Sequence, residues 1–170
     1  MAAGHRASVI AVASLIAMQQ GCCLLGNKDE ATHTDHELAE CGLALKLPSH
    51  FGKPSHGAGC SYEWTANAGE TVLRLESALP GDKGQNADPK TAMPTQTVDY
   101  ARSTKFGALP AKERRTQESM GAKRRIVWTA FIEGPKGAVN LKVMMVQTET
   151  PDEFGESFWT NLRKRWVQPL

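Results

Sequence analysis

The chain has 170 residues, of which 41% are hydrophobic, enough for one domain around one core. Lys and Arg together number 20 against 18 Asp and Glu. Arg6 precedes Cys22 and every acidic residue follows it, so the part of the chain after Cys22 carries 19 basic and 18 acidic residues. This balance excludes the strongly basic surface that is typical of nucleic-acid-binding proteins, and we expect no nucleic-acid partner.

The N-terminus combines a short basic segment with a hydrophobic one. Residues 1–6 contain Arg6, and residues 7–18 carry no charge. This order is typical of a secretory signal peptide. Twelve residues rise about 18 Å as a helix, whereas a transmembrane helix needs about 20 residues. We therefore expect residues 1–21 to be a signal peptide that directs export.

The hydrophobic segment ends in Gln19, Gln20, Gly21, Cys22 and Cys23. This end resembles the lipobox of bacterial lipoproteins, in which a small residue precedes a cysteine that is diacylated and becomes the new N-terminus. Gly21 and Cys22 fit that pattern, whereas Gln19 and Gln20 stand where the family prefers an apolar and a small residue. The resemblance implies lipidation of Cys22, anchoring to a membrane through the lipid, and a periplasm-facing location in a bacterial envelope. The alternative is a secreted protein in which Cys22 and Cys23 join disulfides.

The next segment, residues 22–39, is polar and follows neither the period of a strand nor that of a helix. Such a composition cannot bury enough apolar surface to order itself. We expect a flexible lipidated tether here and a single folded domain over residues 40–170.

Five later segments alternate apolar and polar residues with the period of a β-strand. They are residues 41–47, 60–66, 71–76, 124–133 and 138–148. Turn residues separate the second segment from the third and the fourth from the fifth, so we expect two antiparallel hairpins. The fourth segment is apolar on both faces, which indicates a central strand. Residues 109–120 are ambiguous and could form an edge strand or a solvated coil.

Two helices are expected. One runs from Thr95 to Phe106 and ends at Gly107. The other begins at a capping box over residues 150–153 and carries large apolar side chains four residues apart. These are Phe154, Phe158, Leu162 and Trp166. The sequence therefore predicts an α+β fold, with a single antiparallel sheet of about five or six strands flanked by a C-terminal amphipathic helix and one shorter helix.

This order of elements resembles the small envelope and thylakoid domains of the PsbP, Mog1 and DcrB-like group. In that group an early strand ends in Leu-Pro, as Leu47 and Pro48 do here, and a late hairpin leads into a terminal helix, as residues 139–166 do. The resemblance implies a non-enzymatic accessory or assembly role.

Cys41 and Cys60 are the natural disulfide partners in an oxidising compartment once Cys22 is acylated. Closing this loop contributes about 3 kcal/mol in the chain-entropy model. If residues 41–47 and 60–66 paired as a simple hairpin, however, the two cysteines would lie about 20 Å apart. The disulfide therefore requires that these strands are not paired in that way.

The histidines offer weak candidates for chemistry. His33 and His36 have HxxH spacing, but a solvated tether would give metal ligands no supporting hydrogen bonds, so we expect no metal site. His50 and His56 lie in a loop near Cys60 and could pair with its thiol, although no third member of a catalytic set is evident.

No catalytic motif or cofactor fingerprint occurs in the chain, and we expect no cofactor. The favoured interpretation is an envelope lipoprotein with a binding or accessory role, which presents the loop of residues 79–94 and a sheet face to an envelope protein. One alternative is a small envelope hydrolase or metal-dependent enzyme that uses His50 and His56. The other is a structural lipoprotein without a ligand.

Overall fold

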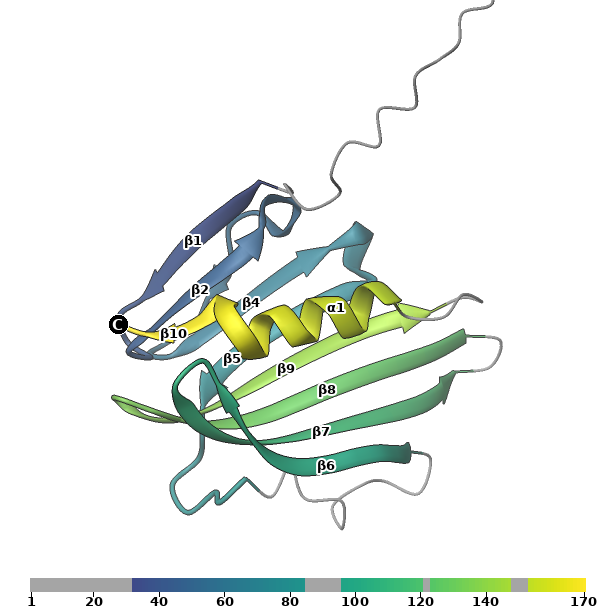
Figure 1. Cartoon of the computed structure of the whole chain (residues 1–170). Helices are drawn as coiled ribbons and strands as arrows, with labels where there is room; N and C mark the ends of the chain where they lie inside the picture. The colour runs from purple at the N-terminus through teal and green to yellow at the C-terminus, as the bar shows by residue number, and fades with distance from the viewer. Residues whose placement is uncertain (1–31, 85–95, 121–122, 148–152) are drawn as a thin grey trace, which may run out of the picture. The chain divides into compact units, whose positions relative to one another are not determined.

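The computed structural model describes residues 32–84, 96–120, 123–147 and 153–170 (Figure 1). These residues form two antiparallel sheets, of seven and three strands, and one α-helix that lies along a face of the larger sheet. The predicted α+β class, with a single sheet of five or six strands and two helices, is therefore wrong. The described part of the chain is mostly β.

The larger sheet has the strand order β3-β4-β5-β9-β8-β7-β6. In chain order its strands are β3 (Ser55–His56), β4 (Ser61–Ala66), β5 (Thr71–Ser77), β6 (Gln96–Phe106), β7 (Leu109–Met120), β8 (Lys123–Gly134) and β9 (Gly137–Gln147). The hairpins β4–β5 and β8–β9 are the two that the sequence predicted. Residues 126–132 of β8 are all buried, which confirms the prediction of a central strand.

The smaller sheet has the order β1-β2-β10. Its strands are β1 (His33–Leu38), β2 (Leu43–Pro48) and β10 (Val167–Pro169). β1 lies within the predicted tether of residues 22–39, pairs with β2 along its whole length and buries Leu38. The tether prediction is therefore wrong for residues 33–38, because pairing with β2 orders a segment that has little apolar surface of its own.

The segment predicted as a helix from Thr95 to Phe106 forms β6 over its described residues. β6 pairs with β7 and shifts register once, between Val98 and Tyr100. Thr, Val and Tyr suit a pleated strand, and pairing with a neighbour outweighs a weak helical pattern. The ambiguous residues 109–120 form β7, which lies between β6 and β8 and is therefore neither an edge strand nor a coil.

The C-terminal helix α1 (Glu153–Asn161) continues as a π-helical turn, η5 (Leu162–Trp166), and leads directly into β10. Phe158, Leu162 and Trp166 are buried, as the apolar stripe predicted. The first three residues of the predicted capping box, 150–152, lie outside the described residues. Within the described residues, no helix has the length and apolar character needed to cross a membrane.

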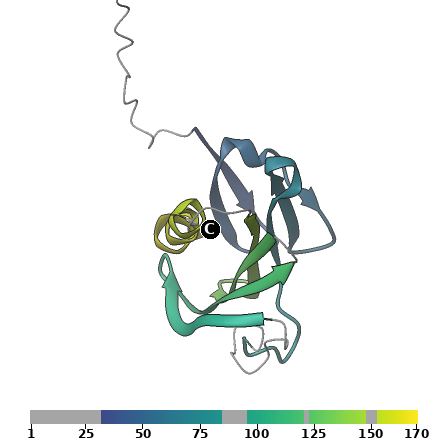
Figure 2. The same ribbon diagram turned by 90° about the vertical axis from the view of Figure 1, so that its right-hand side faces the viewer.

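Side chains from both sheets and from the helix form one hydrophobic core. The larger sheet carries the helix on one face, and the view along the helix axis shows this layering (Figure 2). Trp159 of α1 stacks with Trp128 of β8 at 6.3 Å between ring centroids and meets Phe106 edge-on at 5.2 Å. All three rings are fully buried, so this contact fixes the helix on the sheet.

Candidate binding site

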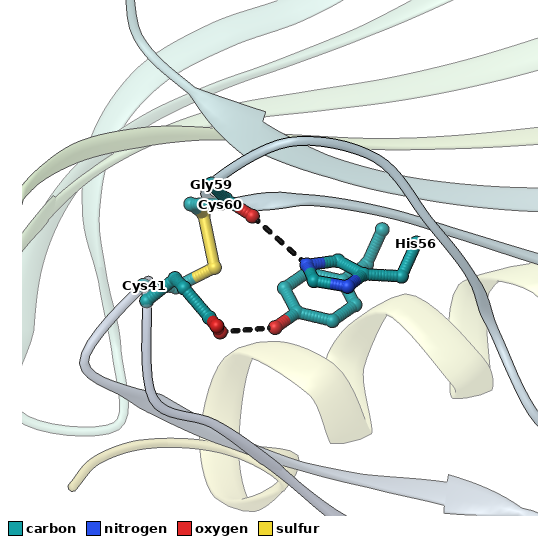
Figure 3. The surroundings of a disulfide bond; sticks show 6 residues. Cys41, His56, Gly59 and Cys60 are labelled. Atoms are coloured by element: carbon teal, nitrogen blue, oxygen red, sulfur yellow. Dashed lines mark hydrogen bonds between the residues drawn. A yellow bond between two sulfur atoms is a disulfide. The ribbon is translucent and has the colours of Figure 1, made fainter.

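Cys41 and Cys60 form a disulfide, with their Cα atoms 4.9 Å apart (Figure 3). Cys41 lies in the turn between β1 and β2, and Cys60 immediately precedes β4. These strands belong to different sheets, which meets the condition that the sequence set for this pairing. The bond therefore links the smaller sheet covalently to the larger one.

Aromatic and polar side chains surround the disulfide. The Tyr62 hydroxyl donates to Glu40 Oε2 at 2.5 Å, and the His56 ring stacks on Tyr62 with centroids 4.4 Å apart. His56 Nε2 lies 3.0 Å from the Gly59 carbonyl oxygen (Figure 3). Burial, followed by the contact with Glu40, raises the pKa of Tyr62 to about 12. The hydrogen bond from Tyr62 in turn lowers the pKa of Glu40.

This arrangement leaves the predicted cysteine and histidine pair without a nucleophile. The Cys60 sulfur is bonded to Cys41, so it cannot act as a thiolate. His50 packs on Phe51 at 4.9 Å, whereas His56 packs on Tyr62, so each histidine has its own aromatic partner.

A surface groove of about 450 Å³ lies beside His56. Its charged side chains include Glu63 and Arg74, which form an ion pair across β4 and β5. The hydroxyl of Ser55 donates to the Glu63 carbonyl oxygen at 3.3 Å. The groove thus offers polar surface, but Glu63 pairs with Arg74 and the Ser55 hydroxyl bonds the main chain, so these groups do not form a nucleophile and base.

The two histidines of the HxxH segment lie on β1. Side chains three residues apart on a strand point to opposite faces, which separates His33 from His36. His33 packs on Trp166 at 5.0 Å, and His36 packs edge-on against Trp64 at 5.4 Å. Burial lowers the pKa of His36. Within the described ranges no group of three or more His, Cys, Asp or Glu residues is placed to hold a metal ion.

The described part of the predicted binding loop, residues 79–84, packs on the sheet. Asn140 Nδ2 donates to Asp82 Oδ2 at 3.2 Å, and Lys112 Nζ donates to the Lys83 carbonyl oxygen at 2.9 Å. These contacts lie on the sheet face opposite the helix. Residues 85–94 of the loop, like Cys22, lie outside the described residues.

The strongest concentration of buried charge lies between α1 and the β6–β7 end of the sheet. Glu113 of β7 is fully buried and accepts three hydrogen bonds. Arg102 Nε and Arg163 Nη1 donate to its Oε1 atom at 2.6 and 2.9 Å, and Trp159 Nε1 donates to Oε2 at 2.8 Å. We call these four residues the Glu113 cluster.

The alternation of β7 explains why a carboxylate points into the interior. Glu113 pairs with Ala130 of β8, and both side chains face the helix. Arg102 lies opposite Glu113 on β6, while Trp159 and Arg163 come from the helical segment above. Two strands and the helical segment therefore meet at one carboxylate, whose negative charge faces two guanidinium groups.

A second group of charges surrounds Arg115, two residues along β7 on the same face. Arg115 pairs with Asp99, and its Nε atom lies 2.8 Å from Glu156 Oε1. Gln117 Nε2 also donates to Asp99, at 2.9 and 3.0 Å to its two oxygens. The Arg115 guanidinium lies 5.5 Å from the centre of the Trp128 ring. One arginine here faces two carboxylates, the reverse of the ratio in the Glu113 cluster.

The ring of Tyr100 contacts Arg102 of the Glu113 cluster. The Arg102 guanidinium lies 4.6 Å from the centre of the Tyr100 ring, within the range of a cation–π contact. Burial raises the pKa of Tyr100 to about 12, with smaller contributions from Glu113 and Glu156. The hydrogen bond to Glu113 raises the pKa of Arg102, which keeps its positive charge at all ordinary pH values.

No family profile matches the chain, and no curated protein matches it either. Among solved structures it is similar to a protein of unknown function, PA94 from Pseudomonas aeruginosa. That similarity has a TM-score of 0.45 and 14% sequence identity, over 81% of this chain and 98% of the other. At this level the similarity assigns neither a family nor a function.

Sequence reasoning missed the Glu113 cluster. Residues 109–120 fitted an edge strand or a solvated coil, and neither interpretation places Glu113 in the interior. One signal was available: in β7, Glu113 and Arg115 lie at alternate positions, as the residues of one face of a strand do. That spacing indicates a charged strand face, but not that a helix covers it.

Proposed function

We propose that this protein is an exported bacterial envelope lipoprotein, acylated at Cys22, with a non-enzymatic binding or accessory role. The observation that carries the proposal is the Cys41–Cys60 disulfide. Disulfides form and persist in oxidising compartments such as the bacterial periplasm and are rare in the cytosol. A structural disulfide and the predicted N-terminal export signal thus support the same location by independent routes.

The position of β1 adds a constraint to the proposed anchor. Because β1 begins at His33, no more than ten residues, 22–31, precede the described part of the chain on the mature side of the proposed cleavage. Ten residues reach at most about 36 Å when fully extended. The folded domain would therefore work close to the membrane surface.

The binding role is supported by the Glu113 cluster. A fully buried carboxylate is costly to desolvate and often adds no net stability, so one that orients arginines toward the surface supports a role in binding. Two features of the resemblance to the PsbP, Mog1 and DcrB-like group are retained, the Leu-Pro end of β2 and a late hairpin before the terminal helix, and by analogy they favour an accessory role over catalysis.

Mass spectrometry of the N-terminal peptide tests the location. The protein would be expressed from its full sequence in a Gram-negative bacterium and extracted from the envelope fraction with mild detergent. We expect a mature N-terminus at Cys22 that carries a diacylglyceryl group. The Cys22→Ala variant should remain unprocessed, whereas the matched Cys23→Ala variant should be processed as usual. An unmodified N-terminus at any residue other than these two cysteines would contradict the proposal.

A further inference from the structure

The Glu113 cluster contains two guanidinium groups but one carboxylate. Arg102 Nε and Arg163 Nη1 contact the same oxygen at 2.6 and 2.9 Å, so these two nitrogens lie within about 5.5 Å of each other. Positive charges this close repel each other, and a single carboxylate cannot neutralise both. One positive charge is left over within the cluster.

The two arginines still have free donors. Glu113 occupies only Nε of Arg102 and Nη1 of Arg163. Within the described residues, both terminal nitrogens of Arg102 and the Nε and Nη2 atoms of Arg163 make no hydrogen bond. The Arg102 side chain is 51% exposed and that of Arg163 is 21% exposed. A molecule in solution can therefore reach the unoccupied N–H groups of Arg102.

Both arginines are held in place before any ligand arrives. The buried carboxylate of Glu113 fixes one edge of each guanidinium, and the Tyr100 ring supports the flat face of Arg102 at 4.6 Å. The backbone of Arg163 is fixed as well, because its carbonyl oxygen accepts a 2.7 Å hydrogen bond from the Gly107 amide. Side chains that are ordered in advance lose less entropy on binding, which favours a ligand at this position.

We propose that Arg102 and Arg163 bind a carboxylate group of a ligand on the solvent side of the Glu113 cluster. A guanidinium presents parallel N–H groups that match the two oxygens of a carboxylate. Two positive charges against the single negative charge of Glu113 suit a monoanion, and the nearby carboxylate of Glu156 opposes a dianion such as phosphate. This inference deepens the proposed binding role and rests on it.

Nuclear magnetic resonance on the isotope-labelled protein, purified in detergent from the envelope fraction, tests the proposal. The reporter is the Trp159 indole N–H, which bonds the same carboxylate as the two arginines. Its signal is assigned by its loss in Trp159→Phe. We expect it to shift and saturate with sodium acetate at a dissociation constant on the order of millimolar, beyond any shift in sodium chloride of equal ionic strength.

Two variants of β6 distinguish binding at a specific site from a general effect of positive charge, and a variant of α1 tests the nearby negative charge. Arg102→Gln should weaken acetate binding about tenfold, because it removes a charge-assisted pair of hydrogen bonds. Lys105→Gln removes the same charge from an exposed position on the same strand and should change the affinity less than about twofold, as for a screened surface charge. Arg102→Lys keeps the positive charge but loses the parallel N–H groups of the guanidinium, so its affinity for acetate should lie between those of the other two variants. Glu156→Gln should strengthen binding, because it removes a nearby negative charge.

Two further ligands define the class. N-acetyl-trialanine with a free C-terminus should bind, and the same peptide with an amidated C-terminus should not. Tighter binding of the acid peptide than of acetate would identify a chain end as the source of the carboxylate. Equal binding of the amide, tighter binding of phosphate, the absence of saturation, or equal losses in Arg102→Gln and Lys105→Gln would each overturn the proposal.

The same sample keeps the two proposals apart. Its intact mass reports whether Cys22 is acylated, and the titration reports whether the arginines bind a carboxylate. An acylated protein that does not bind acetate would overturn the proposed site without affecting the proposed location. An unacylated protein that binds acetate would overturn the proposed location without affecting the proposed site.

Discussion

Removal of the Cys41–Cys60 disulfide is expected to destabilise the domain by about 3 kcal/mol. The bond joins residues 19 positions apart in the sequence. In the chain-entropy model a loop of this size loses about 11 cal/mol/K of conformational entropy in the unfolded state, which corresponds to about 3 kcal/mol at room temperature. Both cysteines are buried, so Cys41→Ala with Cys60→Ala also removes a little packing at each end.

Urea unfolding followed by tryptophan fluorescence measures this effect. Trp64 and Trp128 are fully buried and should report the loss of the core. With a slope of about 2 kcal/mol per molar urea, the midpoint should fall by about 1.5 M. The wild-type chain in a thiol reductant is the matched control, because it breaks the bond and keeps the cysteine side chains.

The comparison of these two samples separates the effect of loop closure from the effect of sulfur packing. If the covalent link stabilises the fold by restricting the unfolded chain, reduced wild-type protein and the double-alanine variant should unfold at nearly the same urea concentration. An unchanged midpoint after verified reduction would refute the entropic argument. A double variant that is far less stable than the reduced protein would show that sulfur packing, not loop closure, dominates.

Three further predictions concern pH and backbone geometry. Both of the protein's tyrosines, Tyr62 and Tyr100, have a pKa raised from 10.0 to about 12, so phenolate absorbance should not appear near pH 10. Because the folded chain keeps these protons longer than the unfolded chain, stability should fall as the pH rises from 10 toward 12. Burial lowers the pKa of His36 from 6.5, so the unfolded chain takes up its proton first and stability should fall below pH 6.5; His36→Phe should reduce that fall in thermal unfolding. Gly107 has a φ of 55°, and a Cβ atom there would lie 2.7 Å from the Val167 carbonyl oxygen, so Gly107→Ala should cost at least about 1 kcal/mol in urea unfolding.

The sequence predicted secondary structure best where one face of a strand is buried and the other is exposed to solvent. In β4 and β5, Trp64 and Leu73 face the core while Glu63 and Arg74 face solvent, and the alternation in sequence reads directly as a hairpin. β6 lacks that contrast, because Phe106 alone among its eleven side chains is buried and the others are partly or fully exposed. A short segment without a clear period is decided by its neighbours, and the neighbour of β6 was itself ambiguous.

β1 was missed for a related reason. Its residues are polar, and only Leu38 is buried. The strand is ordered mainly by backbone pairing with β2, from His33 opposite Pro48 to Leu38 opposite Leu43. Main-chain hydrogen bonds do not depend on the type of side chain, so the amino-acid composition does not reveal them. A search for apolar segments therefore assigns such a strand to a linker.

The Glu113 cluster poses the question of why a charged residue occupies a fully buried position between a helix and a sheet. Stability alone is a weak answer, since buried ion pairs replaced by apolar side chains of similar size often leave a protein equally or more stable. A leucine at this position would require no arginine partners, although the buried Trp159 indole N–H would lose its acceptor. What an apolar residue could not do is orient Arg102 at the surface with outer N–H groups that have no acceptor among the described residues. The cluster is therefore better explained by the carboxylate ligand that we propose for its arginines than by the packing of Glu113 in the interior.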